Sequence, residues 1–291
     1  MKIIKYFFEF ITIISLFSIF KLIGLKNASN LGGILGKFIG PFFRSKHTIE
    51  QNIKIGLGEL DKKKESEIIN SMWSNIGRTF AEYIFLKDFR FNKTNFNHMK
   101  INGINHLEEI KKNNEKVIFY SAHLANFELM AMELDKLGIK CAAIYRPLNN
   151  FFLNPLMEYL RMKYICPNQI PKGRMGMRDI ISKIKDGYSV ALMVDQRVSE
   201  GPRAPFFNKP AHTTTIPAQL ALKYNCKLVP ISLERKEGSN FEMTILEPYK
   251  IQKTGDEIED TKNITLKINQ IVEKMIINNP KQWIWSHNRW K

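Results

Sequence analysis

Short apolar runs alternate with amphipathic stretches through most of the chain. The runs have the length of buried strands, and apolar residues in the stretches recur at helical spacing. Strands are predicted at 117–120, 139–145, 188–194, 227–234 and 241–246. Helices are predicted at 61–89, 126–137, 151–163, 178–185, 214–224 and 260–278. This order favours an α/β domain with a largely parallel or mixed central sheet flanked by helices.

The beginning of the chain has a different pattern. Residues 6–25 are mostly apolar, interrupted by Glu9 and Lys21, and as a helix they would be about 30 Å long, enough to cross a hydrocarbon core. A helix that lies in the membrane interface, or one buried in the protein, fits the same pattern. More basic residues follow the segment than precede it, which favours a cytoplasmic position for the rest of the chain. We predict a membrane anchor helix over 1–26 and a single domain over 27–291.

A second helical stripe follows, over residues 31–39. Its other face carries Gly32, Gly33 and Gly36 where a soluble helix would carry charge, and Pro41 ends it. The segment could lie in the membrane interface, pack on the first helix, or pack inside the protein.

The charge of the chain limits its possible partners, and its cysteine content indicates the redox state of its compartment. The 291 residues include 44 Lys and Arg against 28 Asp and Glu, a net charge of +16, which suggests nucleic acid, an anionic bilayer or an acidic carrier protein as partner. A compositional bias toward Lys would give the same excess. Because the basic residues are scattered and no nucleic-acid-binding motif occurs, we expect no nucleic acid partner. Three widely spaced cysteines without a CxxC pair argue against a disulfide framework and favour a reducing compartment.

The segment SAHLANFELM, residues 121–130, is the first candidate for chemistry. His123 falls between a predicted strand and a predicted helix, and Glu128 follows on the first turns of that helix. A histidine can take a proton near neutral pH, and a carboxylate can orient it and stabilise its cation. On one regular helix this spacing would separate the two side chains, so they can meet only if His123 lies in the turn. The spacing alone also occurs by chance.

Two more polar clusters follow predicted strands. Arg146 precedes a proline and could bind a phosphate or an oxyanion, or be a solvated charge. Asp195 and Gln196 follow the strand 188–194 and could belong to a site or form a turn. Functional loops of α/β sheets gather at the carboxyl ends of the strands, so we expect these residues to converge with His123.

Two aromatic segments are candidates for contact with lipid. Residues 201–210 are predicted to form a rigid, proline-rich loop with exposed aromatic residues, which could line an acyl-chain or lipid surface or simply be a well-packed loop. Trp283, Trp285 and Trp290 suit an interfacial belt, but packing of these rings onto the sheet is the simpler explanation and the one we favour.

These residues together resemble the bacterial lipid A biosynthesis acyltransferases, the lauroyl and myristoyl late enzymes of the H-x4-D/E acyltransferase superfamily. The resemblance runs along the whole chain and rests on five motifs in order. They are SAHLANFE, YRPLNN, MVDQR, PFFNKPAHTTTIPAQLALKYNCKLVPISLER and PKQWIWSHNRWK. In the family form of the first motif, glycines stand at the positions of Ala122 and Ala125, and tryptophan at Phe127. Because glycine allows closer backbone approach, the shape of the substrate site could differ here.

The resemblance implies a glycerolipid-acyltransferase-like fold behind an N-terminal membrane helix. It implies O-acyl transfer from acyl carrier protein to a hydroxyl of a Kdo-bearing lipid A precursor at the cytoplasmic side of the bacterial inner membrane. His123 and Glu128 would be catalytic, with His123 as general base oriented by Glu128. Arg146, Asp195 and Gln196 would bind substrate, and no metal or cofactor is required.

Other acceptors and one non-enzymatic function fit parts of the sequence. Acyltransferases of phosphatidylinositol mannosides look similar over the same motifs, so another glycolipid or phospholipid is an alternative acceptor. A membrane protein that only binds lipid would keep the apolar helices but would not need His123 or Glu128.

Overall fold

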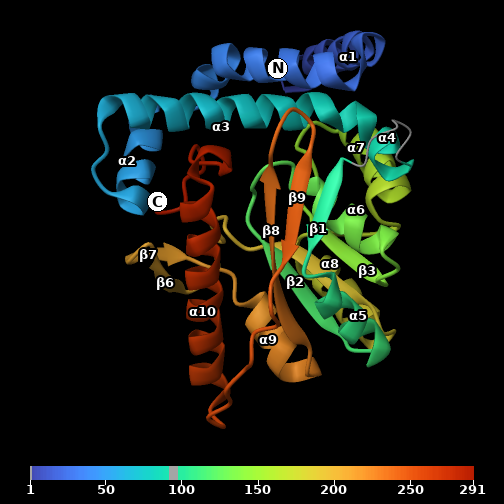
Figure 1. Ribbon diagram of the computed structural model, residues 1–291, viewed down its shortest axis with the longest axis vertical. Coiled ribbons are helices and arrows are strands. Elements are labelled where there is room, and N and C mark those ends of the chain that lie inside the picture. Colours follow the sequence, from blue (N-terminus) through green and yellow to red (C-terminus); the bar gives the residue numbers. More distant parts are fainter. Residues whose placement is uncertain (1, 92–97) are drawn as a thin grey trace.

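A seven-stranded sheet forms the centre of the chain in the computed structural model, which describes residues 2–91 and 98–291 (Figure 1). Its strands are β1 (Met99–Asn102), β2 (Val117–Ser121), β3 (Cys141–Tyr145), β4 (Asn168–Pro171), β5 (Ser189–Met193), β8 (Lys227–Arg235) and β9 (Phe241–Ile245). They lie in the order β1-β9-β8-β2-β5-β3-β4. The five strands from β8 to β4 run parallel, whereas β9 is antiparallel to β8 and β1 is parallel to β9. The expected mixed sheet is therefore confirmed.

Helices cover both faces of this sheet. Among the described residues, the α-helices after the N-terminal segment are α2 (Lys46–Leu57), α3 (Lys62–Glu82), α4 (Leu86–Phe91), α5 (Ile104–Lys112), α6 (Glu128–Lys136), α7 (Asn154–Leu160), α8 (Arg174–Lys185), α9 (Ile216–Tyr224) and α10 (Glu257–Asn278). Strand β2 alternates between the two layers. Phe119 packs into the core cluster that includes α6, and Ile118 and Tyr120 pack into the cluster that includes α10. Both faces of β2 are apolar because both are buried.

The predicted elements agree with the structure, with local differences. All five predicted strands are present. The helix expected at 61–89 is divided into α3, a 3₁₀ turn and α4, and the one at 151–163 into α7 and a π-helical turn. The sequence reading missed α2, α5, β1 and β4. The two missed strands have four residues each and lie at the edges of the sheet, so they offer too few positions for an alternating pattern.

The N-terminal segment forms one long helix, α1 (Lys2–Ile39), with a break at Gly24 (φ 79°, ψ 162°). A glycine is needed there because this φ is unfavourable for other residues. Helices α1 and α3 lie along one another across one end of the sheet (Figure 1). Their contact is close. A Cβ atom on Gly36 would overlap the carbonyl oxygen of Trp73, and one on Gly77 would overlap that of Gly32. The glycine face of 31–39 thus packs inside the protein.

By length and composition, α1 could cross a membrane, and only 11% of its apolar window is buried. Its inner side nevertheless contacts the protein body. Phe17 and Phe20 are buried, and Lys21 forms an ion pair with Asp88 at 2.8 Å.

The expectation of exposed aromatic residues in the loop 201–210 was wrong. This segment contributes to a two-stranded hairpin, β6 (Arg203–Phe206) and β7 (Lys209–His212). Phe206 and Phe207 are 0% and 8% exposed, and the Phe206 ring lies 6.1 Å from that of Trp283. Trp283 and Trp285 are buried as well, so they pack in the core and do not form an interfacial belt. Burying these rings against one another removes a large apolar area from water.

Candidate active site

Three neighbouring strands bring the predicted site residues together. Strands β2, β5 and β3 are adjacent and parallel, so the loops that follow them leave the same edge of the sheet. His123 follows β2, Asp195 and Gln196 follow β5, and Arg146 follows β3. His123, Arg146 and Gln196 line one pocket, and Asp195 lies behind His123. The expected convergence is confirmed.

The carboxylate that binds His123 is that of Asp195. Its Oδ1 lies 2.8 Å from His123 Nδ1, and its Oδ2 accepts hydrogen bonds from the His123 backbone N–H (3.1 Å) and from Trp283 Nε1 (2.7 Å). Burial raises the pKa of Asp195, but the charge of His123 and these hydrogen bonds outweigh it and lower the pKa to about 2. An ionised Asp195 can only accept, so His123 carries its proton on Nδ1. Its Nε2 is then free to take a proton.

Glu128 has a different partner from the one that its spacing suggested. It is the first residue of α6, and its carboxylate binds Arg161, with Arg161 Nη2 at 2.5 Å and Nε at 3.2 Å from Oε1. The Phe127 ring packs edge-on against the His123 ring, with centroids 4.6 Å apart. The expected contact between Glu128 and His123 is therefore corrected: Asp195 orients the histidine, and Glu128 holds an arginine in the same pocket.

Arg161 is a site residue that the sequence reading missed. It begins a π-helical turn, Arg161–Ile165, directly after α7, and such turns are frequent at functional sites. Its guanidinium lies 5.6 Å from the centre of the Tyr83 ring and 5.3 Å from that of Tyr145. It is 9% exposed, and its Nη1 has no hydrogen-bond partner among the described residues. In the sequence, the only sign of this site residue was a basic residue within a predicted helix that is rich in apolar residues.

The C-terminal segment contributes His287. Its Nε2 accepts a hydrogen bond from the Arg197 backbone N–H at 3.0 Å, and the side chain lines the pocket. Burial lowers the pKa of His287 to about 4, assisted by the nearby charges of His123, Arg289 and Arg44, against the opposing effect of Asp195. His287 is therefore neutral at neutral pH.

The pocket joins these groups to an apolar wall. It has a volume of about 270 Å³. Small and apolar side chains from α6, β3 and β5 form part of its lining: Met130, Ala131, Ala143, Ala191, Leu192 and Met193. Cationic side chains also line it: Arg146, Arg161, Lys172 and Arg197. The pocket thus combines a base, an apolar wall and several cations. This arrangement suits removal of a proton from a hydroxyl, after which the hydroxyl oxygen attacks an acyl group. Within residues 2–91 and 98–291, no three His, Cys, Asp or Glu side chains gather to hold a metal ion.

Comparison with known proteins identifies a family and several relatives of this chain. The family model for bacterial lipid A biosynthesis acyltransferases matches residues 1–291. The chain is 24% identical over 273 residues to the lipid A biosynthesis lauroyltransferase of Escherichia coli, covering 90% of this chain and 84% of that protein. The Escherichia coli palmitoleoyltransferase is 24% identical over 270 residues, with the same shares covered. A lipid A biosynthesis acyltransferase of Haemophilus influenzae is 25% identical over 252 residues, 83% of this chain and 76% of that protein. The chain is thus an acyltransferase, and it belongs to the bacterial lipid A biosynthesis acyltransferase family.

Proposed function

We propose that this enzyme transfers a fatty acyl group from an acyl carrier protein thioester to a hydroxyl of a Kdo-bearing lipid A precursor. The family supplies the reaction class and a lipid acceptor. The observation that carries the proposal is the His123–Asp195 pair at the edge of a pocket that has both an apolar wall and cationic side chains. An acyl chain suits the former, and the phosphates of a glycolipid suit the latter.

His123 acts as the general base in this proposal. Its Nε2 takes the proton of the acceptor hydroxyl, whose oxygen attacks the thioester carbonyl carbon. Asp195 stabilises the imidazolium that forms and keeps the ring oriented. When the tetrahedral intermediate collapses, the carbon–sulfur bond breaks and the imidazolium returns its proton to the departing thiolate. The ester product and free thiol of the carrier then leave, and His123 is neutral again.

Two arginines stabilise the negative charge of the substrates in this proposal. Arg161, held by Glu128, lines the pocket, and its buried Nη1 has no hydrogen-bond partner among the described residues, which makes it a candidate donor to a phosphate or to the oxyanion. Arg146 is exposed at the same pocket and can do the same at its rim. Gln196 also lines the pocket and offers an amide to the acceptor sugar. Glu128 contributes through Arg161, which gives it a part in the site without contact to His123.

The donor is proposed to be an acidic carrier protein. The net charge of +16 favours encounter with an acidic partner, and Lys172 and Arg197 add positive charge beside the pocket. We expect the association rate to fall as salt is raised, because the attraction is screened over about 10 Å at 0.1 M ionic strength.

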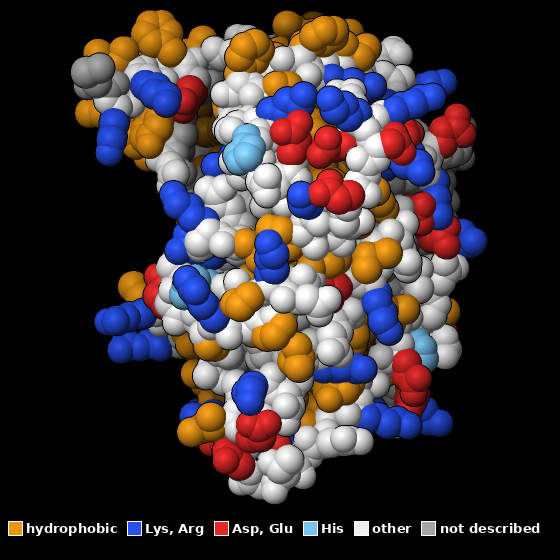
Figure 2. Space-filling view, turned by 90° about the vertical axis from the view of Figure 1, so that its left-hand side faces the viewer, with side chains coloured by type: hydrophobic (Ala, Val, Ile, Leu, Met, Phe, Trp, Pro, Cys, Tyr) orange, Lys and Arg blue, Asp and Glu red, His pale blue; other side chains and the backbone are white. Residues whose placement is uncertain are grey.

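We further propose that α1 lies in the surface of the inner membrane, with the body of the enzyme on the cytoplasmic side. One side of its first half packs on the protein, through Phe10, Ile13, Phe17 and Phe20. The opposite side is apolar and exposed, through Ile4, Phe8, Ile11, Ile19 and Leu22. Figure 2 shows hydrophobic side chains along the end of the molecule that α1 occupies in Figure 1. A helix that is apolar on both sides and covered on one of them suits burial at the interface. Cysteines that are free and buried agree with a reducing compartment.

An assay with acyl carrier protein thioester and Kdo-lipid A precursor tests the reaction. We expect product with the native enzyme and a loss of at least about 10²-fold with His123→Ala. Mass spectrometry of lipid A from a deletion strain tests the acceptor, because a missing acyl chain identifies acceptor and donor chain together. Unchanged lipid A would contradict this acceptor and point to another glycolipid or phospholipid.

A further inference from the structure

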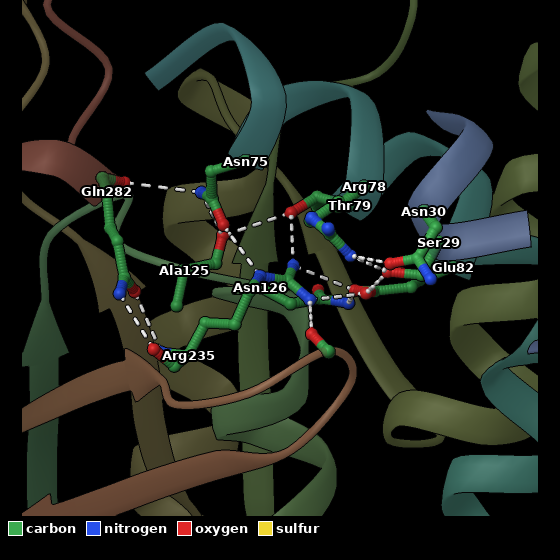
Figure 3. A network of polar contacts seen from close by, with 11 residues as sticks. Ser29, Asn30, Asn75, Arg78, Thr79, Glu82, Ala125, Asn126, Arg235 and Gln282 are labelled. Carbon is green, nitrogen blue, oxygen red and sulfur yellow. Dashed lines mark hydrogen bonds and ion pairs between the residues drawn. The ribbon is translucent and has the colours of Figure 1, made fainter. Parts of the chain in front are cut away.

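Figure 3 shows a cluster of polar side chains around Glu82 and Arg235, next to Ala125 and Asn126. Ala125 and Asn126 belong to the loop that carries His123, and none of the side chains of the cluster lines the pocket. At the centre of the cluster, Glu82 of α3 and Arg235 of β8 form a bidentate ion pair, with Arg235 Nη2 at 3.0 Å from Glu82 Oε2 and Nη1 bound to Oε1. Their side chains are 0% and 7% exposed. Arg235 Nε also donates to Asn75 Oδ1 at 2.9 Å. The cluster thus joins α3 to the sheet.

The cluster binds two successive residues of that loop. The carbonyl oxygen of Ala125 accepts hydrogen bonds from Asn75 Nδ2 at 3.0 Å and from Thr79 Oγ1 at 3.1 Å. The Asn126 side chain donates to Glu82 Oε2 at 2.9 Å. Ala125 has a φ of 51°, a conformation that is unfavourable for any residue with a Cβ atom. Contacts from α3 therefore hold the loop in a backbone shape that it would not adopt alone.

Stability alone is a weak explanation for such an ion pair. Two charges lose their hydration on burial, and apolar side chains of similar size often stabilise a protein equally well. The geometry suggests a more specific role, because Ala125 lies two residues after His123 and its position fixes where the imidazole can reach. His123 must meet Asp195 on one side and the substrate on the other, and both requirements fail with small displacements.

We propose that Thr79, Glu82 and Arg235 are positioning residues, which hold the loop of residues 122–127 so that His123 is aligned between Asp195 and the acceptor hydroxyl. They act through the backbone of Ala125 and the side chain of Asn126. The inference rests on the proposed role of His123 as the general base.

Two side chains that donate to the Glu82 carboxylate, those of Asn126 and Ser29, offer a matched pair of substitutions. Asn126→Ala removes the hydrogen bond from the loop, and the Asn126 Oδ1 atom has no partner to lose among the described residues. Ser29→Ala removes the hydrogen bond that α1 donates to Oε1 of the same carboxylate at 2.7 Å, together with the bond that Ser29 accepts from Arg78. Both variants weaken the cluster, but only Asn126→Ala releases the loop.

Steady-state kinetics separates the two effects. We expect Asn126→Ala to lower kcat by about tenfold or more, as small misalignments of a catalytic group do, with KM changed by less than about threefold. Ser29→Ala should keep kcat within about twofold of the native value, although both variants unfold at lower temperature. Thr79→Val should lower kcat in the same way, and Thr79→Ser, which keeps the hydroxyl, should restore it.

A second measurement does not depend on the reaction. In protein with ¹⁵N-labelled histidine, the Nδ1–H of His123 bound to Asp195 should give a distinct NMR signal, assigned through its loss in Asp195→Asn. We expect this signal to weaken or move in Asn126→Ala and Thr79→Val and to persist in Ser29→Ala and Thr79→Ser. Equal losses of kcat in Ser29→Ala and Asn126→Ala, or native kcat and signal in Asn126→Ala, would overturn the positioning role. Full activity of His123→Ala would instead overturn the general base, whatever the NMR signals show.

Discussion

At the scale of single residues, the Asp195 carboxylate uses both of its oxygens in hydrogen bonds that orient His123. Its Oδ2 accepts from two N–H groups and its Oδ1 from the imidazole. In Asp195→Asn, the side-chain amide oxygen must accept the hydrogen bonds from the two N–H groups. The amide NH₂ group of the new asparagine therefore points toward His123 Nδ1. The ring must then carry its proton on Nε2, where it cannot act as a base. We expect kcat to fall by about 10²- to 10⁴-fold. Thermal unfolding serves as the control for folding, and a folded variant with kcat within about threefold of native would contradict the assignment.

Glu128 and Arg161 are predicted to act as one unit. If Glu128 works only by holding Arg161, its loss adds nothing once Arg161 is gone. We therefore expect the double variant Glu128→Gln, Arg161→Gln to have the same kcat/KM as Arg161→Gln alone. The measurement is a double-mutant cycle on kcat/KM. Losses that multiply would show that Glu128 acts on the substrate or on His123 independently.

His287 predicts a dependence of stability on pH. Its pKa is about 4 in the folded protein, against 6.5 as its ordinary value. Between these values the unfolded chain binds a proton that the folded chain does not, so stability falls as pH is lowered from about 6.5 toward 4. We expect the unfolding midpoint of His287→Gln to change less over this range than that of the native protein. The exposed His47 is the control, and His47→Gln should follow the native curve.

At the scale of elements, the contact between α1 and α3 depends on glycine. Gly77 faces the backbone of Gly32 and Gly36, where a Cβ atom has no room. Gly77→Ala should separate the two helices and lower the free energy of unfolding by about 1–3 kcal/mol, the usual range for overpacking. Ser66→Ala, on the exposed side of α3, should change it by less than about 0.5 kcal/mol. Unfolding followed by tryptophan fluorescence in detergent measures both, and equal effects would argue against close packing.

Elements differ in how well their sequences predict them. The strands β2 and β5 are buried along almost their whole length, so they are nearly continuous apolar runs and were located within one or two residues. Strand β8 begins with a buried apolar run and then alternates between buried and half-buried residues, and it was located equally well. The hairpin β6–β7 reads as a proline-rich loop, because its short strands carry Pro205 and Pro210. Its burial comes from α10 and from the C-terminal tryptophans, which no local pattern contains.

At the scale of the whole molecule, the orientation of α1 distinguishes an interfacial enzyme from one that spans the membrane. Lys2 and Lys26 flank the apolar stretch, and both are exposed. If α1 lies in the interface, Lys2→Cys and Lys26→Cys should react with a membrane-impermeant maleimide from the same, cytoplasmic side. A spanning helix would place residue 2 on the other side. Labelling of spheroplasts and inverted membrane vesicles measures this, and the native cysteines do not interfere because they are buried.

The sequence by itself determined the class of the fold, five of the seven strands of the central sheet and the loops that carry the chemistry. It did so because burial on both faces of a strand, and the turn after it, leave a local pattern. It could not determine which polar side chains bind one another. His123 and Asp195 are 72 residues apart and meet because β2 and β5 are neighbours in the sheet, whereas Glu128, only five positions away, is turned to Arg161 by the start of α6. The buried contacts of Glu82 and Arg235 likewise join segments 153 residues apart. Spacing along the chain governs local structure, but the order of strands and the packing of helices decide which charges share a low-dielectric interior and therefore which of them pair.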